Sequence, residues 1–395
     1  MRILYHHRTQ GRGVEGVHIR GLVSGLVALD HEVEVMSVAD SADAEQVLRP
    51  AAEAGGSSAP PSGGKLKWIA EKSPELVFEL LEVAFNVYAG LRIVRSVRRR
   101  RPDVIYERYS LFLFVTTWLA RHWGIPIVLE VNDSAVVERV RPLHMRGLAA
   151  SIERWVFRNA TGLVFVSSSF RDLCRSAHGD LAPAIVSPNC ADVALFDRSR
   201  YDRDAIRARL GLTGKTVCGY VGAFIPWHGI DWFVSEIAPR LHERPDLALL
   251  LVGDGRVYEE TREVVRRAGA ESQVVFTGRV AHAQVPEYIA AMDYAVLPDS
   301  NVYGSPMKLF ELMAMEVAVV APDYPPVAEV IVDRQTGWLF RAGDRAGCVE
   351  QVLRVAGDAV ERESNGTAAA AYVRRERQWS HNAADMLRLA ARGEG

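Results

Sequence analysis

Cysteine is scarce in this sequence of 395 residues, and its placement argues against two kinds of structural site. The four cysteines, Cys174, Cys190, Cys218 and Cys348, form no Cys-x-x-Cys pair and have no histidine at a metal-ligand spacing. The sequence therefore predicts neither a structural zinc site nor a disulfide framework. Four scattered thiols in a chain of this length are typical of a reducing compartment.

An excess of charge of either sign and a long uninterrupted apolar run are also missing. Lysine and arginine number 47 and the acidic residues 49, so a net charge of −2 gives no general attraction for nucleic acid or anionic lipid. The first residues, MRILYHHRTQGRG, lack the apolar core of a signal peptide. Segment 75–97 carries five charged residues, which indicates an amphipathic helix and not a membrane span. We therefore expect a cytoplasmic protein without a nucleic acid partner.

What is present is the composition of an ordinary globular protein, with 49% hydrophobic residues and a length that suggests two domains. Short β-branched and apolar runs alternate with longer segments of helical period, which is typical of parallel sheets crossed by helices. Helices are predicted between the strands, notably at 17–29, 75–98, 111–122 and 148–159. The predicted strands are 2–5, 32–38, 104–107, 126–130, 163–167, 184–188, 217–221, 247–252, 274–277, 294–298, 317–321 and 338–341.

Three other segments shape this α/β prediction of two doubly wound sheets. The polar segment 197–215 predicts a boundary between two similar halves, and the Gly/Pro/Ser-rich segment 51–64 predicts a loop inside the first. Segment 368–391 predicts one long C-terminal helix. Open α/β sheets bind ligands at the carboxyl ends of their strands, so the polar residues that follow the strands are the candidates for chemistry.

The densest such signal is YAVLPDSNVYGSPMKLFELMAMEVAVVAP, residues 294–322. We predict a strand ending at Pro298 and a helix opening at Pro306 with Ser305 as its N-cap, so that free N–H groups suit a phosphate. Lys308, one of only five lysines, falls in the first turn, where a cation opposes the helix dipole unless an anion is near. Glu311 follows on the same helix face and could accept bonds from ribose hydroxyls. A surface Lys–Glu pair is the open alternative.

Residues 304–314 resemble the donor-binding signature of family-4 retaining glycosyltransferases of the GT-B fold, in the variant G-S-P-x-K-L-F-E-x-M-A. Three more segments resemble that family in order and spacing: IVSPNCADVALF (185–196), GYVGAFIPWHGID (219–231), and LLVGDG (250–255) with VFTG (275–278). The N-terminal strand, glycine loop and helix match as well. The resemblance covers nearly the whole chain.

The resemblance implies two Rossmann-like domains facing a central cleft. They are an acceptor-side domain at 1–198, with a C-terminal helix at about 375–395 packing back on it, and a donor-binding domain at 199–374. It implies transfer of a sugar from a UDP- or GDP-sugar, with retention and with no metal or other cofactor. The few apolar stretches of the sequence favour a small-molecule hydroxyl or thiol as the acceptor over a polyprenyl lipid. The leaving phosphate would act as base, so no enzyme nucleophile is required. A homodimer is an open possibility, and membrane association is not favoured.

The resemblance also assigns roles residue by residue. Glu311 would bind the ribose, Gly304, Ser305 and Lys308 would hold the diphosphate, and Lys308 would neutralise the charge of the leaving group. Other implied donor contacts are Gly16 in the N-terminal loop, Gly222 and His228 in the diphosphate loop, and Arg279 and Val280 near the base. Three positions depart from the usual pattern. Tyr303, still counted with the donor site, stands where many relatives have a glutamate, and Ala223 and His228 stand where they have an arginine and a lysine.

In the first half, polar residues follow the strand at 126–130. Glu130 or Asp133 could orient or deprotonate an acceptor, and Asn132 could bind it. The alternative is a helix N-cap at Asn132 or Asp133 and a core-edge Glu130. His18 and Glu107 are further acceptor-side candidates. The alternatives for these two are a half-buried histidine and a structural salt bridge between Glu107 and Arg108.

Two other functions stay open at this point. Another GT-B activity, such as nucleotide-sugar epimerisation, would use the same donor residues. A non-catalytic nucleotide-sugar-binding or membrane-surface protein is the alternative of a different class. It is suggested by Tyr303, by Ala223, and by the arginine run 98–101 after the amphipathic segment.

Overall fold

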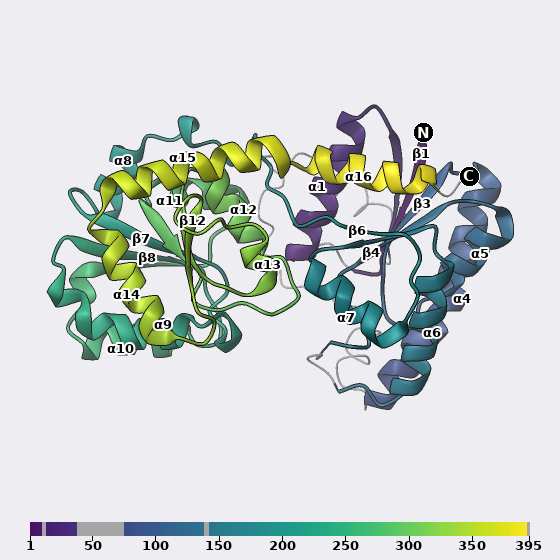
Figure 1. Cartoon of the computed structure of the whole chain (residues 1–395), viewed down its shortest axis with the longest axis horizontal. Coiled ribbons are helices and arrows are strands. Elements are labelled where there is room, and N and C mark those ends of the chain that lie inside the picture. The colour runs from purple at the N-terminus through teal and green to yellow at the C-terminus, as the bar shows by residue number, and fades with distance from the viewer. Residues whose placement is uncertain (10–12, 38–74, 138–141, 393–395) are drawn as a thin grey trace. The chain divides into compact units, whose positions relative to one another are not determined.

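The computed structural model describes residues 1–9, 13–37, 75–137 and 142–392 (Figure 1). The chain forms two compact units, one of Met1–Ser187 with Trp379–Gly395 and the other of Pro188–Gln378. The predicted boundaries, 1–198 with the returning helix and 199–374, remain predictions, because compactness alone does not show which segments fold independently. The loop predicted at 51–64 lies outside the described residues.

The first unit is built on a parallel sheet in the order β2-β1-β3-β4-β5-β6. The order reverses between β1 and β3, which makes the carboxyl ends of these two strands a topological switch point. Its strands are β1 (Arg2–His6), β2 (Glu32–Met36), β3 (Val104–Arg108), β4 (Ile127–Val131), β5 (Gly162–Phe165) and β6 (Ala184–Val186). Its helices are α1 (Val14–Ala28), α4 (Glu75–Arg99), α5 (Val115–Trp123), α6 (Arg146–Asn159), α7 (Ser168–His178) and α16 (Trp379–Ala391).

The second unit repeats the plan in the order β12-β11-β10-β7-β8-β9, with its switch point between β7 and β10. Its strands are β7 (Thr216–Val221), β8 (Leu247–Val252), β9 (Val274–Gly278), β10 (Tyr294–Val296), β11 (Val319–Pro322) and β12 (Gly337–Phe340). Its α-helices are α8 (Arg203–Leu210), α9 (Ile230–Ile237), α10 (Tyr258–Arg267), α11 (Val285–Ala290), α12 (Met307–Ala314), α13 (Pro325–Ala328), α14 (Arg345–Ala356) and α15 (Ala359–Glu376). Short 3-10 helices are η1 (Arg198–Arg200), η2 (Pro226–His228), η3 (Ala238–Glu243), η4 (Glu271–Gln273) and η5 (His282–Gln284). The predicted pair of doubly wound parallel sheets is confirmed.

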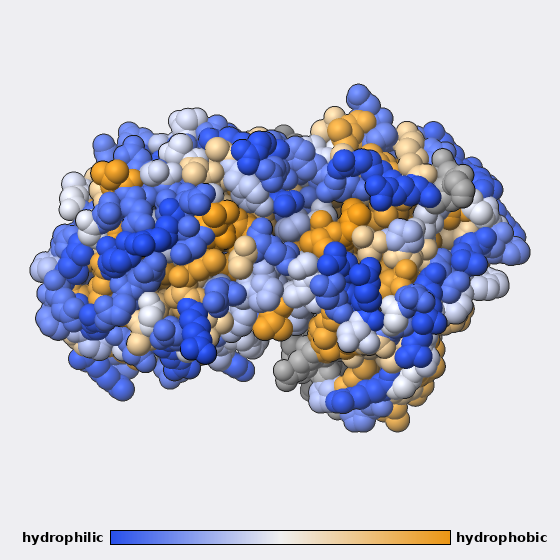
Figure 2. Space-filling view, viewed as in Figure 1, coloured by the Kyte–Doolittle hydropathy of each residue, from blue (hydrophilic) through white to orange (hydrophobic). Residues whose placement is uncertain are grey.

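The sheets explain why several strands read as continuous apolar runs. Every residue of β4 and of β8 is buried, because helices cover both faces of each sheet. Over the visible surface, hydrophilic residues predominate and apolar residues form smaller groups between them (Figure 2). Within the described part of the chain, no helix is long and apolar enough to cross a membrane.

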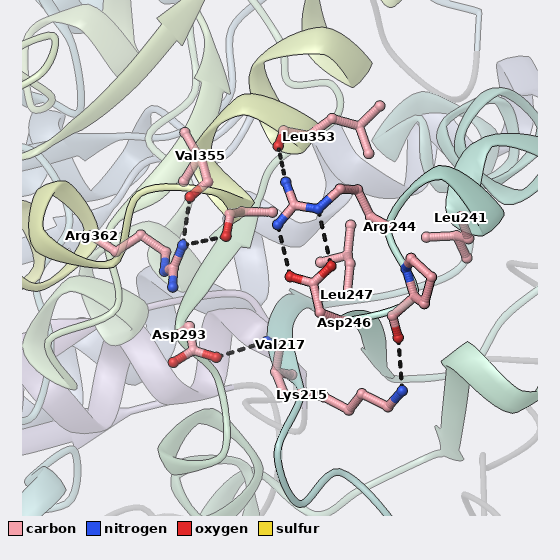
Figure 3. Close-up of polar contacts among 12 residues, drawn as sticks. Lys215, Val217, Leu241, Arg244, Asp246, Leu247, Asp293, Leu353, Val355 and Arg362 are labelled. Carbon is pink, nitrogen blue, oxygen red and sulfur yellow. Dashed lines mark hydrogen bonds and ion pairs between the residues drawn. The ribbon is translucent and has the colours of Figure 1, made fainter.

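Buried or half-buried arginines complete the helix ends of the second unit. The Arg362 guanidinium donates to the carbonyls of Val355 and Ala356, and Arg244 donates to the carbonyl of Leu353, all in the last turn of α14 (Figure 3). The Val355 carbonyl also accepts from the Asp358 N–H, so the guanidinium groups add donors to the C-terminal carbonyls of α14, where backbone donors run out. Arg244 also pairs with Asp246, the residue before β8.

The single C-terminal helix predicted at 368–391 is wrong, because the chain forms two helices there. The helix α15 ends at Glu376 and α16 begins at Trp379. Between them the Arg377 carbonyl accepts a hydrogen bond from the Ala191 N–H, and Arg377 leaves the helical conformation with φ −127° and ψ 49°. The break lies where the chain passes from the second unit back to the first.

Candidate functional site

The segment between β10 and α12 is shaped by one asparagine side chain. The Asn301 carboxamide oxygen accepts hydrogen bonds from the N–H groups of Tyr303 and Gly304, which is the pattern of an Asx turn. A Cβ at Gly304 would lie 2.8 Å from this oxygen, so a larger residue would push the turn open. The turn thereby carries the chain from the carboxyl end of β10 to the start of α12.

The predicted N-cap at Ser305 is wrong. The N-cap of α12 is Pro306, and no side chain caps the helix. The Ser305 hydroxyl instead accepts from the Asn189 N–H at 3.1 Å, while the Asn189 carboxamide donates to the Ser305 carbonyl at 2.6 Å. Asn189 belongs to the Pro-Asn dipeptide of segment 185–196. Nothing in the sequence of that segment predicts a contact between Asn189 and Ser305. The first N–H groups of α12 are thus left without a side-chain cap.

Lys308 lies in the first turn of α12 with its ammonium inside the protein. The Nζ atom is buried, has no hydrogen-bond acceptor among the described residues, and lies 5.1 Å from the centroid of the Tyr220 ring. Burial lowers the pKa of Lys308 to about 8, while the nearby Glu311 carboxylate opposes that shift. An ammonium held this way gains most from an anionic ligand that supplies the missing acceptors.

The chain after β7 approaches this ammonium closely. Gly222 has φ +151°, and a Cβ there would lie 2.5 Å from Lys308 Nζ. Gly253, which follows β8, packs so tightly that a Cβ on it would lie 1.9 Å from the Gly222 carbonyl oxygen. A Cβ at either position would strain the structure, and the backbone after β7 lies directly beside the Lys308 side chain.

His228 ends η2 in the same loop. Its Nδ1 lies 2.9 Å from the Ala223 carbonyl oxygen, which also accepts from the Tyr220 hydroxyl at 2.8 Å. Burial, and then the positive charge of Lys308, lower the pKa of His228 to about 4. The imidazole is thus neutral at neutral pH in the unliganded protein, so Lys308 provides the positive charge at this loop.

Glu311 is a buried carboxylate with 6% exposure, and its partner is a histidine that the sequence did not single out. The Oε1 atom of Glu311 lies 2.7 Å from Nε2 of His282, in η5. The surface Lys–Glu alternative is therefore wrong, because neither Lys308 Nζ nor Glu311 lies on the surface. No motif pointed to His282, since an isolated histidine before a short helix has no distinctive spacing.

Arg279 and Val280 follow β9, after Gly278 with φ +68°. Arg279 is exposed, whereas Val280 packs against the apolar core of the second unit. The second unit thus brings together Gly222, His228, Lys308 and Glu311 around its switch point, with Tyr303, Gly304 and Ser305 on the loop before α12.

In the first unit, Glu130 is buried at the carboxyl end of β4 and is fully engaged. Its carboxylate accepts from Arg108 at 2.5 Å, from the Tyr106 hydroxyl at 3.2 Å and from the Asn132 carboxamide. Burial alone would raise the pKa of Glu130, but His18, Arg108 and these hydrogen bonds lower it below its usual value. The network therefore suits orientation of neighbouring groups better than proton removal.

The predicted Glu107–Arg108 salt bridge is not formed. Glu107 is completely buried and lies 2.5 Å from Nδ1 of His6, while Arg108 pairs with Glu130. Successive side chains on a strand point to opposite faces of the sheet, so Glu107 and Arg108 do not pair with each other.

The predicted N-cap at Asn132 or Asp133 is also wrong. The next helix, α6, begins only at Arg146, and the Asp133 carboxylate accepts from the N–H of Ser134. The side chains of both residues are half-buried.

Two candidates near the N-terminus lie on α1. Gly16 falls in the first turn of this helix, not in a loop, and its N–H donates to the Gly13 carbonyl. The buried His18 lies 3.4 Å from Glu130 and packs edge-on against Trp379. Burial lowers the pKa of His18 to about 4, so its imidazole is neutral at neutral pH.

No group of three or more His, Cys, Asp or Glu side chains among the described residues could hold a metal ion, and metal-independent chemistry stays a prediction.

Comparison with known sequences identifies a family for each half of the chain. Residues 15–190 match the family described as "Glycosyl transferase 4-like domain", and residues 215–358 match "Glycosyl transferases group 1". Over 291 residues, 69% of this chain and 67% of the relative, the sequence is 30% identical to 2-deoxystreptamine N-acetyl-D-glucosaminyltransferase of Streptomyces fradiae. The chain therefore belongs to the glycosyltransferase family that these two domain descriptions and this relative define.

Other similarities are more distant. The chain is 25% identical to alpha-D-kanosaminyltransferase of Streptomyces kanamyceticus over 60% of its length, and 26% identical to 2-deoxystreptamine glucosyltransferase of the same organism over 53%. These matches span 63% and 57% of the relatives' own lengths. Among solved structures, a glycosyltransferase from Rickettsia africae (15% identity, TM-score 0.73, covering 100% of this chain and 98% of that one) shares the fold. Anabaena HepE, crystallised with UDP, does so too (15% identity, TM-score 0.71, 99% and 100% coverage). The fold is GT-B.

Proposed function

We propose that this protein transfers a glycosyl group from a nucleoside diphosphate sugar, with UDP or GDP as the nucleotide, to a hydroxyl or thiol of a small-molecule acceptor. The observation that carries the proposal is the buried Lys308 ammonium, which lacks an acceptor among the described residues and lies beside the Gly222 backbone and the uncapped start of α12. A diphosphate would supply the missing acceptors for both. Glu311, one turn further along α12, would accept from the ribose hydroxyls.

In this proposal the reaction retains the anomeric configuration and needs no metal. The bond between the anomeric carbon and the phosphate oxygen breaks as the acceptor oxygen or sulfur bonds to the same face of that carbon. The acceptor proton passes to the leaving phosphate oxygen. Lys308 and the N–H groups at the start of α12 stabilise the negative charge that develops on the diphosphate.

On the acceptor side, we propose that Glu130 acts through its hydrogen-bond network and that Asn132 and Asp133, which are half-buried at the same strand end, contact the acceptor. Two relatives are named for transfer to 2-deoxystreptamine. A small aminocyclitol is therefore the first acceptor class to test, and the cytoplasm is the expected compartment.

Binding tests the donor site first. UDP, GDP and ADP are titrated by calorimetry into the protein and into Glu311→Ala. We expect one nucleotide to bind with micromolar affinity and the variant to lose at least about tenfold, since a hydrogen bond to a charged group contributes about 1.5–3 kcal/mol. Binding of none of the three, or unchanged binding by Glu311→Ala, contradicts the assignment.

Turnover then separates transfer from epimerisation. Purified protein is incubated with UDP- or GDP-sugars, with and without 2-deoxystreptamine, and the products are read by mass spectrometry and by the anomeric proton coupling. Transfer predicts a new glycoside with the donor's anomeric configuration only when an acceptor is present. An epimerase would convert the donor sugar without any acceptor.

Association with a membrane surface is a second candidate function, favoured by the surface of α4. Val87 and Leu91 on this helix are each 69% exposed, and Arg98 and Arg99 lie in its last turn. Sedimentation with vesicles of phosphatidylcholine, with and without phosphatidylglycerol, tests this candidate. Binding that needs the anionic lipid and is lost in Val87→Glu/Leu91→Glu supports it.

A further inference from the structure

His282 is the sole hydrogen-bond partner of Glu311 among the described residues. Its Nε2 lies 2.7 Å from Oε1 of Glu311, while Oε2 has no hydrogen bond from any described residue. Glu311 is 6% exposed, so its position is fixed by the surrounding helix and by this single bond. The carboxylate thus has one oxygen committed within the protein and one oxygen available to a ligand.

The imidazole is itself held in place by its surroundings. His282 opens η5, whose turn is closed by a hydrogen bond of 2.8 Å from the Gln284 N–H to the Ala281 carbonyl. The ring packs at 5.6 Å between centroids against Phe196, which is 1% exposed. An aromatic neighbour in the core restricts the rotation of the histidine ring, whose side chain is 31% exposed, and favours the Nε2–H direction toward Glu311.

We propose that His282 is a positioning residue for ribose recognition: it donates Nε2–H to Oε1 of Glu311 and thereby presents Oε2 to the ribose hydroxyls. This inference rests on the proposed function, since it concerns the same donor site. A carboxylate oxygen has two lone pairs, so Oε2 alone can accept from both the 2′- and the 3′-hydroxyl. The His282–Glu311 pair keeps the acceptor preorganised, which lowers the conformational cost of binding.

A purely structural ion pair predicts something different. If His282 only stabilised the fold around η5, its loss would weaken binding of every ligand of the site to the same extent. If His282 orients Glu311 toward the ribose, its loss weakens only those ligands that carry ribose hydroxyls. Nucleotides with and without these hydroxyls therefore separate the two roles.

The test compares UDP, GDP and ADP with their 2′,3′-dideoxy analogues, titrated into the unchanged protein and into His282→Ala, His282→Gln and Glu311→Ala. The glutamine carboxamide nitrogen reaches about as far as Nε2 and can replace the donated hydrogen bond, so His282→Gln is the rescue variant. We expect the unchanged protein to prefer the ribonucleotide by at least about tenfold. His282→Ala should lose most of this preference without losing affinity for the dideoxynucleotide, and His282→Gln should regain it. In a Glu311→Ala background, His282→Ala should have no further effect.

Three other outcomes would overturn the role proposed for His282, and the first of them would overturn the proposed function as well. Failure of the unchanged protein to bind any of the three nucleotides would overturn the proposed function and this inference with it. A ribose preference that persists in His282→Ala would overturn this inference alone. Equal weakening of both nucleotide types in His282→Ala, with no rescue by His282→Gln, would also overturn it, in favour of the structural role.

Discussion

The ammonium of Lys308 lies 5.1 Å from the centre of the ring of Tyr220, a residue of β7 that is far from it in sequence. The aromatic face attracts the cation but offers no lone pair, so Nζ stays without a hydrogen-bond acceptor among the described residues. Burial consequently lowers the pKa of Lys308 to about 8. Two consequences follow, one for ligand affinity and one for stability.

Nucleotide affinity should fall as pH rises through 8. A diphosphate binds the charged form of Lys308. Above pH 8 most of the free protein carries the neutral amine, so nucleotide binding requires the uptake of a proton from solvent. The affinity therefore decreases by up to about tenfold per pH unit. The other groups facing Nζ are the Glu311 carboxyl on α12, His228 in η2, whose pKa is lowered to about 4, and the Tyr220 phenol, whose pKa burial raises well above its usual value. Neither His228 nor Tyr220 titrates between pH 7 and 9. Calorimetry over this range measures the effect.

Lys308→Arg is the matched control for this pH dependence. A guanidinium keeps its charge over the whole range, so a variant that still binds should show a flat affinity between pH 7 and 9. A flat profile for the unchanged protein would contradict the lowered pKa of Lys308.

Stability should respond in the opposite direction. The folded pKa of about 8 lies below the unfolded value of 10.5, so between these pH values the unfolded chain binds more protons and the free energy of unfolding rises with pH. Lys308→Met removes the buried charge. It should raise the free energy of unfolding at pH 7 by roughly 1–3 kcal/mol and abolish the rise between pH 8 and 10.5. Urea denaturation at pH 7 and pH 9.5 checks both effects, and a less stable Lys308→Met at pH 7 would contradict them.

The sequence predicts the fold much better than it predicts the contacts of the site. The period of apolar residues is set by local geometry, which explains why the strand at 247–252 has the predicted bounds and others differ by a few residues. The break at Arg377 was missed because it depends on a hydrogen bond from Ala191, which is distant in sequence. No local pattern encodes such a bond.

The same difference between local patterns and contacts distant in sequence applies to the residues of the candidate site. Gly222, Lys308 and Glu311 could be named because each falls in a motif at a strand end. His282, Asn189 and Tyr220 could not be named, because their importance comes from partners on other elements: Glu311, Ser305 and Lys308, respectively. The position of Ser305 before Pro306 predicts an N-cap, but its hydroxyl accepts from the Asn189 N–H instead.

Gly222→Ala should weaken nucleotide binding by about tenfold or more. The new Cβ would lie 2.5 Å from Lys308 Nζ and would displace the ammonium from its position. The φ of +151° is one that L side chains rarely adopt, so the substitution should also cost about 1–3 kcal/mol of unfolding free energy. Calorimetry with the nucleotide and urea denaturation measure the two effects.

Gly211→Ala provides the control for Gly222→Ala. Gly211 has φ +69° at the end of α8, in the left-handed helical region, and a Cβ added there would have no atom within 4 Å. Gly211→Ala therefore carries a positive-φ cost of its own, about 1–2 kcal/mol, without touching the site. Its nucleotide affinity should equal that of the unchanged protein. Equal losses of affinity in both variants would mean that the Gly222 effect arises from general destabilisation.

The close packing of α1 on α16 predicts that a second substitution at Trp379 relieves the stability cost of an alanine at one α1 glycine but not at another. A Cβ at Gly21 would lie 2.3 Å from the Trp379 ring, whereas a Cβ at Gly25 would lie 2.4 Å from the Trp379 carbonyl oxygen. Both alanine variants should destabilise the first unit, Gly25→Ala by about 3 kcal/mol, because a backbone clash cannot be relieved by a side-chain rotation. In urea denaturation, Trp379→Leu should compensate part of the cost of Gly21→Ala and none of the cost of Gly25→Ala. Gly147→Ala, in α6 with open space around it, should instead stabilise by about 0.5–1 kcal/mol. Equal coupling of Trp379→Leu to both glycines would show that α16 shifts as a whole and that the close approach is not fixed by the backbone.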